Sequence, residues 1–446
     1  MCLRESQAFP ANKSRRQQQS NFPALEALTL SKKTPRLGLP HLPQWFSDLF
    51  LHFAEVFSSS TICTGFLCQQ YRDTATGYAD SYHVRMTRPS SASWFVDDLI
   101  PVILESNKNW WPRDLARLAQ VSSGWLGFVR RLLYASPRLH SFNACEQFAR
   151  TLSDNPSLSY LVHGVDLCPV ALDEDHPCIE PKIIRSILAL EGLQSVTLGG
   201  HLAIRAERFL HLLIDPFEVR ELHVDGSLLS TSLRFRPSLE WDEVMATKFT
   251  CLKKLRLTNM DLDIIYPSIP YHLQLRELIL DNVNITAGYL SQLLHDTPSL
   301  DRLRVNSKSA AEFDDQIVFV LASCAVQFLE YEAQLDPPAH TLIFNNVTPF
   351  SSFLRCLRLE GIHANLETLA SLSQSCLNLE ELSILGRAIS ILPCEWAEFI
   401  GSGVLSSLRC LGVPWGTYYP PFMQWSSPAA DLVHKAAALR NVQLIT

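Results

Sequence analysis

The sequence of 446 residues has little glycine, with 17 residues, and little charge, with 19% Asp, Glu, Lys and Arg. With 47% apolar residues, this is a globular composition, which excludes a wholly disordered or fibrous chain. The 12 cysteines are widely spaced and none are paired as CxxC, so a disulfide-rich secreted pattern is excluded. Reduced thiols suit the cytoplasm or the nucleus, where we expect this protein to reside.

Membrane and nucleic-acid signals are also missing. No apolar signal core follows Met1, and the most apolar early stretch, 45–68, is interrupted by Asp48, His52 and Glu55. The formal net charge is −7, so the chain as a whole is not drawn to polyanions. We therefore expect no membrane and no nucleic-acid partner.

The sequence contains no GxSxG, GxxxxGK or HExxH motif. Asp175, His176 and Cys178 lie close together, but no second ligand pair follows at a useful spacing. We interpret them as a proline-bounded loop. The prediction is a non-catalytic protein with no metal and no cofactor.

Residues 1–93 differ in composition from the rest. They contain 10 Lys/Arg and 6 Asp/Glu, a net charge of +4, whereas residues 94–446 contain 28 and 39, a net charge of −11. With a glutamine run, a serine run and scattered prolines, this segment is predicted to be largely disordered or irregular.

What the sequence has in excess is leucine, with 70 residues. Many fall in an LxxLxL frame, in which other apolar residues substitute and which recurs about every 27 residues. The ten copies are Leu193/Val196/Leu198, Val219/Leu222/Val224, Leu252/Leu255/Leu257, Leu275/Leu278/Leu280, Leu300/Leu303/Val305, Val326/Leu329/Tyr331, Leu354/Leu357/Leu359, Leu379/Leu382/Ile384, Leu408/Leu411/Val413 and Leu439/Val442/Leu444.

The last two positions of each frame differ by two, so both point to one face of a short strand. The intervening stretches predict helices, for example 287–295, 314–323, 366–375 and 429–439. Single strand–helix units cannot bury their own apolar faces, so they must stack. We predict an α/β fold with a parallel sheet on the inner face and helices outside, over 191–446.

This pattern resembles the leucine-rich repeat of the long, helix-containing kind, which forms a solenoid. The family has Asn or Cys three residues after the frame, where Met260, Val283 and Ile362 stand. Residues 141–190 are predicted as a linker or first irregular repeat, with a weaker copy at Leu158/Leu161.

Residues 94–140 predict three short helices. Asp97 or Asp98 can cap the first, which carries Leu99, Ile100, Ile103 and Leu104, and Pro112 is well placed to start the second. Ser122 or Ser123 caps a third helix, which ends at Pro137. Its apolar positions at helical spacing are Trp125, Phe128, Val129, Leu132 and Leu133.

This block resembles an F-box. The matching elements are Asp98-Leu99, Ile103-Leu104, Asp114-Leu115, Val121-Ser122 and Trp125, with Phe95-Val96 where the family has Leu-Pro. The resemblance implies that Leu99, Ile103, Leu104, Leu115 and Trp125 lie at the positions that dock a Skp-type linker protein.

An F-box-like block followed by leucine-rich repeats is the layout of substrate receptors in SCF-type, cullin-based ubiquitin ligases. The resemblance implies a substrate-recognition adaptor whose partners are the Skp-type adaptor with its cullin complex and an unknown protein substrate. The alternative is a leucine-rich-repeat scaffold without ligase association, in which the helices only cap the repeats.

The inner sheet would expose alternating charges: Lys254 and Arg256, Glu277 and Asp281, Arg302 and Arg304, Glu330 and Glu332, then Arg358. The arginines could recognise an acidic or phosphorylated peptide. The interpretation that we favour is that these rows neutralise each other as cross-strand pairs. A second candidate surface is an aromatic loop, which could anchor a partner or cover the end of the array; it contains Trp415, Tyr418, Tyr419, Phe422 and Trp425.

Overall fold

The computed structural model describes residues 98–445, with gaps. The gaps are 108–109, 171–180, 228–235, 267, 269–272, 295–296, 298, 309, 334–352, 387–389 and 418–422. The predictions for 1–97, for Asp175, His176 and Cys178, and for Tyr418, Tyr419 and Phe422 lie outside the described residues.

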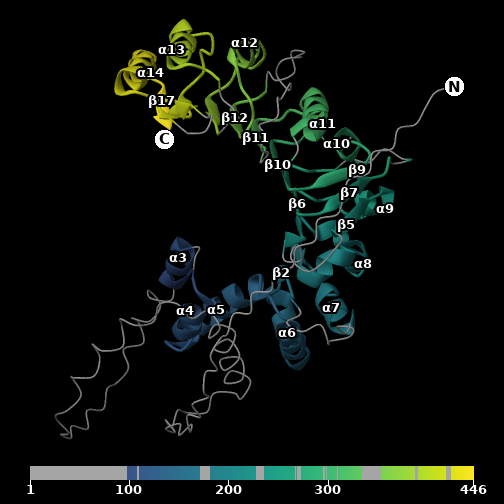
Figure 1. Ribbon diagram of the computed structural model, residues 1–446. Helices are drawn as coiled ribbons and strands as arrows, with labels where there is room; N and C mark the ends of the chain where they lie inside the picture. Colours follow the sequence, from purple (N-terminus) through teal and green to yellow (C-terminus); the bar gives the residue numbers. More distant parts are fainter. Residues whose placement is uncertain are drawn as a thin grey trace, which may run out of the picture. The chain divides into compact units, whose positions relative to one another are not determined.

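The chain has a mixed α/β fold built on a large parallel sheet (Figure 1). Twelve strands pair in the order β1-β2-β3-β4-β6-β8-β10-β11-β12-β13-β14-β17. Their bounds are β1 Arg138–Leu139, β2 Gly164–Leu167, β3 Ser195–Gly199, β4 Glu221–Asp225, β6 Lys254–Thr258, β8 Glu277–Asp281, β10 Arg302–Ser307, β11 Phe328–Ala333, β12 Cys356–Glu360, β13 Glu381–Leu385, β14 Cys410–Gly412 and β17 Gln443–Ile445. The predicted α/β class and parallel sheet are thus confirmed.

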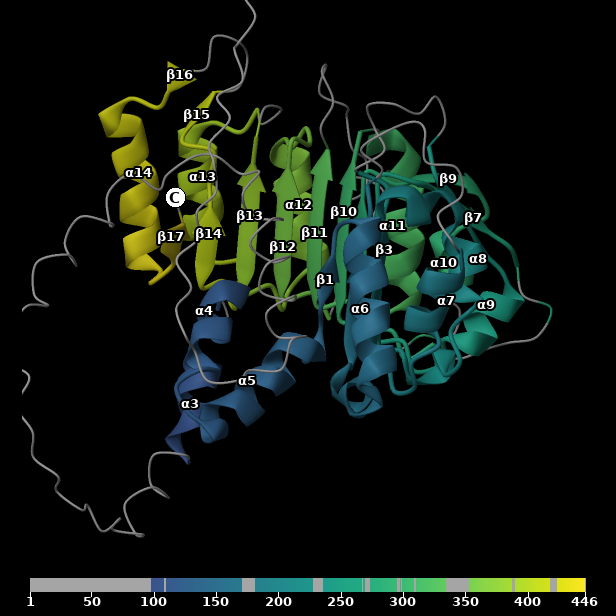
Figure 2. The same cartoon turned by 90° about the horizontal axis from the view of Figure 1, so that it is seen from below.

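Helices connect most successive strands. Figure 2 shows α11 to α14 lying along one side of strands β10 to β14. The α-helices are α3 Leu99–Ser106, α4 Pro112–Leu118, α5 Ser123–Ala135, α6 Phe142–Asp154, α7 Pro181–Leu188, α8 Ala206–Leu210, α9 Glu243–Lys248, α10 Leu290–Leu293, α11 Ala310–Ser323, α12 Leu366–Ser375, α13 Pro393–Ser402 and α14 Ser427–Leu439. Short 3₁₀ helices are η1 Pro156–Leu161, η2 Gly200–Arg205 and η3 Pro216–Glu218.

The leucine frame explains the strands because its last two positions point into the core. In β8, Leu278 and Leu280 are fully buried, whereas Glu277 and Asp281 are partly exposed. Leu278 pairs with Leu255 of β6 and with Leu303 of β10, so the frames of neighbouring strands are in register. All ten predicted copies overlap a strand of the large sheet, and nine of them are in the predicted register.

The last of the ten copies and the weaker copy outside them differ from the prediction. Leu411 pairs with Leu444, so the last frame is displaced by two residues from the predicted Leu439/Val442/Leu444. Leu439 ends helix α14 and is 86% exposed, because the helix continues to this residue. The sheet also contains β2, in which Val165 and Leu167 pair with Val196 and Leu198. The weaker copy at Leu158/Leu161 lies in η1 instead.

A second, three-stranded parallel sheet was not expected from the sequence. Its strands are β5 Ser238–Trp241, β7 Asp261–Ile264 and β9 Asn284–Ala287. The helix predicted over 287–295 is therefore shorter, Leu290–Leu293, because Ala287 belongs to β9. Buried Leu239, Trp241, Leu262 and Ile264 join this sheet to the core. The other three predicted helices are observed.

Glycine and asparagine occupy the turn that follows several strands. Asn259 and Asn282, directly after β6 and β8, have φ of 51° and 53°, and Gly361 after β12 has φ of 71°. This left-handed conformation favours glycine and, next, asparagine. The Asn282 side-chain amide donates a hydrogen bond to the Asn259 side chain. Asn259 and Asn282 thus lie two residues after the frame, one residue before the position where the leucine-rich-repeat pattern has Asn or Cys. That third position holds Met260, Val283 and Ile362, which are buried apolar residues.

The three predicted N-terminal helices are observed as α3, α4 and α5. The Ser122 side chain caps α5 by accepting a hydrogen bond from the backbone N–H of Trp125. Tyr134 at the end of α5 belongs to the continuous core of the large sheet, but five other buried apolar residues of this block do not. They are Ile100, Leu104, Leu115, Ala119 and Val129. Within the described part of the chain, no helix is long and apolar enough to span a membrane.

Candidate interaction surfaces

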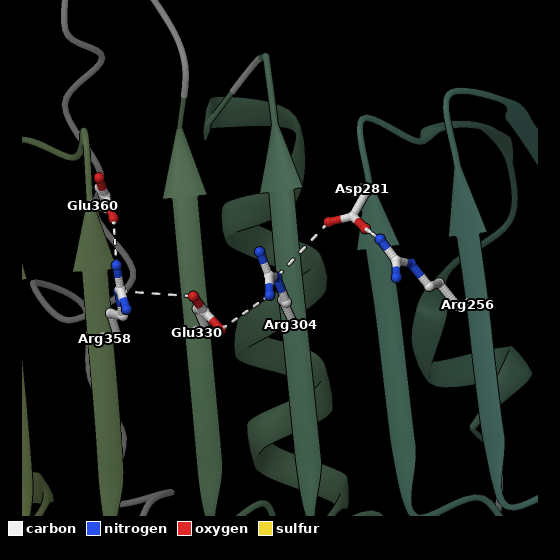
Figure 3. Close-up of polar contacts among 6 residues, drawn as sticks. All are labelled: Arg256, Asp281, Arg304, Glu330, Arg358 and Glu360. Carbon is white, nitrogen blue, oxygen red and sulfur yellow. Dashed lines mark hydrogen bonds and ion pairs between the residues drawn. The ribbon is translucent and has the colours of Figure 1, made fainter. Parts of the chain in front are cut away.

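The exposed face of the large sheet carries a chain of ion pairs. Lys254 Nζ of β6 lies 2.8 Å from Glu277 Oε2 of β8. A longer series begins at Arg256 of β6, whose guanidinium donates to Asp281 Oδ2 of β8 at 2.9 Å, and Arg304 of β10 also contacts Asp281, at 3.8 Å (Figure 3). Acids and bases therefore alternate across neighbouring strands.

The series continues to β12. Glu330 of β11 lies between Arg304 and Arg358, with N···O distances of 3.7 Å to both, and Arg358 also donates to Glu360 at 3.0 Å (Figure 3). The hydrogen bond to Glu360, the largest cause, raises the pKa of Arg358. The favoured interpretation of cross-strand pairing is confirmed for Lys254, Arg256, Arg304 and Arg358.

Arg302 differs from these residues. Its guanidinium lies 4.8 Å from the centre of the Phe328 ring on the adjacent strand β11, and it has no acidic partner within 4 Å among the described residues. This position is therefore a cation–π contact rather than a charge pair, worth about 0.5 to 1 kcal/mol at an exposed site.

The sheet face does not provide an activated nucleophile in the part that the structure describes. Burial, followed by a hydrogen bond to Glu381, raises the pKa of the Cys356 thiol to about 12, so it stays protonated near neutral pH. Burial is also the main cause that lowers the pKa of His223, which contacts Thr258. No group of three His, Cys, Asp or Glu side chains suited to a metal ion occurs among the described residues.

The N-terminal helices and their connections carry exposed apolar side chains, which we call the helical patch: Leu99, Val102, Ile103, Trp111 and Val121. These side chains are 43 to 67% exposed. Two further residues of the predicted docking set, Leu104 and Leu115, are buried in the small core of the block, and Trp125 is half-buried. Of the predicted docking residues, only Leu99 and Ile103 are therefore exposed in the structure.

Val102 and Trp111 were missed as surface residues. Helix α3 has the sequence LIPVILES, in which apolar residues occupy nearly every position, so helical spacing alone does not identify its buried side. Only the packing of Ile100 and Leu104 shows that Val102 and Ile103 face solvent.

The described part of the aromatic loop packs against helix α14. Trp415 stacks on His434 with ring centres 4.9 Å apart and contacts Trp425 edge-on at 5.9 Å. Trp425 is 9% exposed. These two tryptophans flank a short hairpin of β15 Gly416–Thr417 and β16 Met423–Gln424. For Trp415 and Trp425, these contacts favour the interpretation that the aromatic loop covers the end of the sheet over the one that it anchors a partner.

These observations define a mixed α/β protein with a charge-paired sheet face and a separate apolar helical patch. No model of a known protein family matches the sequence. A search of the curated proteins also found no match.

Proposed function

We propose that this chain is a non-catalytic adaptor of an SCF-type ubiquitin ligase, acting in the cytoplasm or nucleus. In this proposal helices α3 to α5 form an F-box-like module that docks a Skp-type linker of the cullin complex. The large parallel sheet and its helices belong to a leucine-rich-repeat solenoid that binds a protein substrate. Neither membrane nor nucleic acid takes part.

The helical patch is the observation that carries the proposal. A block that only capped the repeats would bury its apolar surface against the first strands. Here Leu99 and Ile103 remain 48% and 43% exposed, while Ile100 and Leu104 are the residues of α3 that are buried. Leu99, Val102 and Ile103 are three and four residues apart on α3 and so share one exposed face, and an exposed apolar face favours a protein partner.

The repeat supports the second half of the proposal. Strands in register place the residues between the buried leucines side by side on one exposed face. Such a face offers a broad surface for a polypeptide, with its chemistry set by residues such as Arg302 and Phe328.

The test is co-purification with a Skp-type linker after co-expression. We expect the full chain to form a complex and the double variant Leu99→Lys/Ile103→Lys to lose it. Both side chains are exposed, so the fold should persist, which circular dichroism would check.

The matched control is Val244→Lys, a change at a residue 47% exposed on α9. It should leave the complex intact. A full chain that forms no complex, or equal loss in the control, would overturn the proposal in favour of a scaffold without ligase association.

A further inference from the structure

A row of residues precedes the strands of the large sheet, and their backbones are joined in a hydrogen-bond series. The Lys253 N–H donates to Arg220 O at 2.7 Å, and the Arg276 N–H donates to Lys253 O at 2.8 Å. The same contact repeats to β14. We call these residues the entry row: Arg220, Lys253, Arg276, Asp301, Gln327, Arg355, Glu380 and Arg409.

One half of the entry row compensates its own charge. Glu380 lies between Arg355 and Arg409, with N···O distances of 3.8 and 3.7 Å. Asp301 accepts from the side-chain amide of Gln327 at 3.5 Å. This half follows the same rule as the sheet face, where each arginine of the ion-pair series has an acid beside it.

The other half does not. Arg220, Lys253 and Arg276 directly precede three adjacent strands, and none has an acidic group within 4 Å in the part of the chain that the structure describes. Adjacent strands are about 4.8 Å apart, so the backbones that carry these three cations lie side by side. Directly opposed like charges on neighbouring strands are unfavourable.

A single solvated arginine is ordinary, and that is the alternative explanation for each residue taken alone. It does not explain why three such cations adjoin on a sheet where Lys254, Arg256, Arg304 and Arg358 each have an acidic partner. The acids that follow next in the sequence do not pair with these cations. Glu277 forms an ion pair with Lys254, and Glu221 is in register with Lys254 rather than with Lys253. An external anion would relieve the repulsion.

We propose that Arg220, Lys253 and Arg276 bind a short acidic peptide segment of a partner protein, rich in Asp or Glu. The span covers three strands only, and Asp301 follows it in the row, so a long polyanion such as nucleic acid would meet repulsion beyond it. The proposal rests on the adaptor function in that it names the substrate class.

The test uses the full-length chain and a fluorescent glutamate-rich peptide, with binding followed by anisotropy at increasing salt. We expect saturable binding that weakens as salt screens the charges. The triple variant Arg220→Gln/Lys253→Gln/Arg276→Gln should bind about tenfold more weakly. The same peptide with glutamine in place of glutamate should not bind.

Arg409→Gln is the matched control for Arg276→Gln, because both positions are exposed, cationic and in the entry row. Arg276→Gln should weaken binding and Arg409→Gln should not. Equal loss in the two variants, unchanged binding in the triple variant, or no binding by the wild-type chain would each overturn the proposal. Complex formation with the Skp-type linker, measured on the triple variant, should be unchanged, which separates this failure from failure of the adaptor function.

Discussion

At the scale of single residues, Asp281 lies between two arginines and connects β6 to β10. Its side chain is 14% exposed, whereas Arg256 and Arg304 are 44% and 43% exposed. Solvent screening limits the value of pairs with such exposed partners. The ion-pair series therefore makes a modest contribution to stability and mainly sets which charges remain available to a ligand.

We predict that Asp281→Asn lowers the free energy of unfolding by about 1 kcal/mol at low salt, because Arg256 loses its acidic partner and Arg304 keeps only Glu330. The loss should shrink in about 1 M salt, where the Debye length is about 3 Å. Urea denaturation measures both values. Glu398→Gln, an exposed change on α13, is the control and should have little effect. An equal loss at both salt concentrations would contradict the electrostatic explanation.

At the scale of elements, the turn after β12 depends on glycine. Gly361 has φ of 71°, and a Cβ there would collide with the backbone oxygen of Ala333 at the end of β11. We predict that Gly361→Ala destabilises the protein by about 2 kcal/mol or more, since both strain and collision must be relieved. Thermal unfolding checks this.

Gly127 provides the contrast. It lies within helix α5, and an added Cβ would meet no atom within 4 Å. Gly127→Ala should therefore raise stability, or local helix stability, by up to about 1 kcal/mol. If Gly361→Ala and Gly127→Ala changed the stability in the same direction, the backbone conformation of the glycine would not be the cause of the change.

The sequence predicted most strands because the frame is a local pattern. In β6, buried Leu255 and Leu257 alternate with partly exposed Lys254, exposed Arg256 and partly exposed Thr258, which is the period of a strand. The local pattern does not fix the register of a strand when two registers bury equally apolar residues. Val442 and Leu444 are such a case, and there the end of helix α14 determines that Leu444 pairs with Leu411. It also fails for Trp241, whose strand pairs with a partner outside the frame.

The candidate surfaces were predicted unequally. Alternating charge signs at fixed frame positions indicated the pairs of Arg256 and Arg304 with Asp281, since strand register follows from the frame. The division of α3 into buried and exposed residues was not predictable, because it depends on packing against α5. The sequence did not single out the entry row as a binding surface. Lys253 and Arg276 directly follow the first position of the frame, but the frame defines only its apolar positions and says nothing of the residues between them.

At the scale of the whole described chain, buried residues form one continuous core from Tyr134 to Val442, and α3 to α5 enclose a small core of their own. We predict that backbone amides of α4 exchange with deuterium faster than those of α6, a helix that packs Cys145 and Phe148 into the continuous core. Hydrogen exchange with mass spectrometry measures this. Equal protection of the two helices would show that the block unfolds together with the sheet.

The register of the large sheet is kept while the chain between its strands varies. Val219 and Leu252, equivalent first positions, are separated by 33 residues, and Leu252 and Leu275 by 23. The differences in repeat length thus lie in the segments between the strands, and the strands keep their register. For protein engineering, this means that a tag or a binding loop inserted between strands should leave the charged face intact, whereas one extra residue inside a strand would turn its leucines toward water.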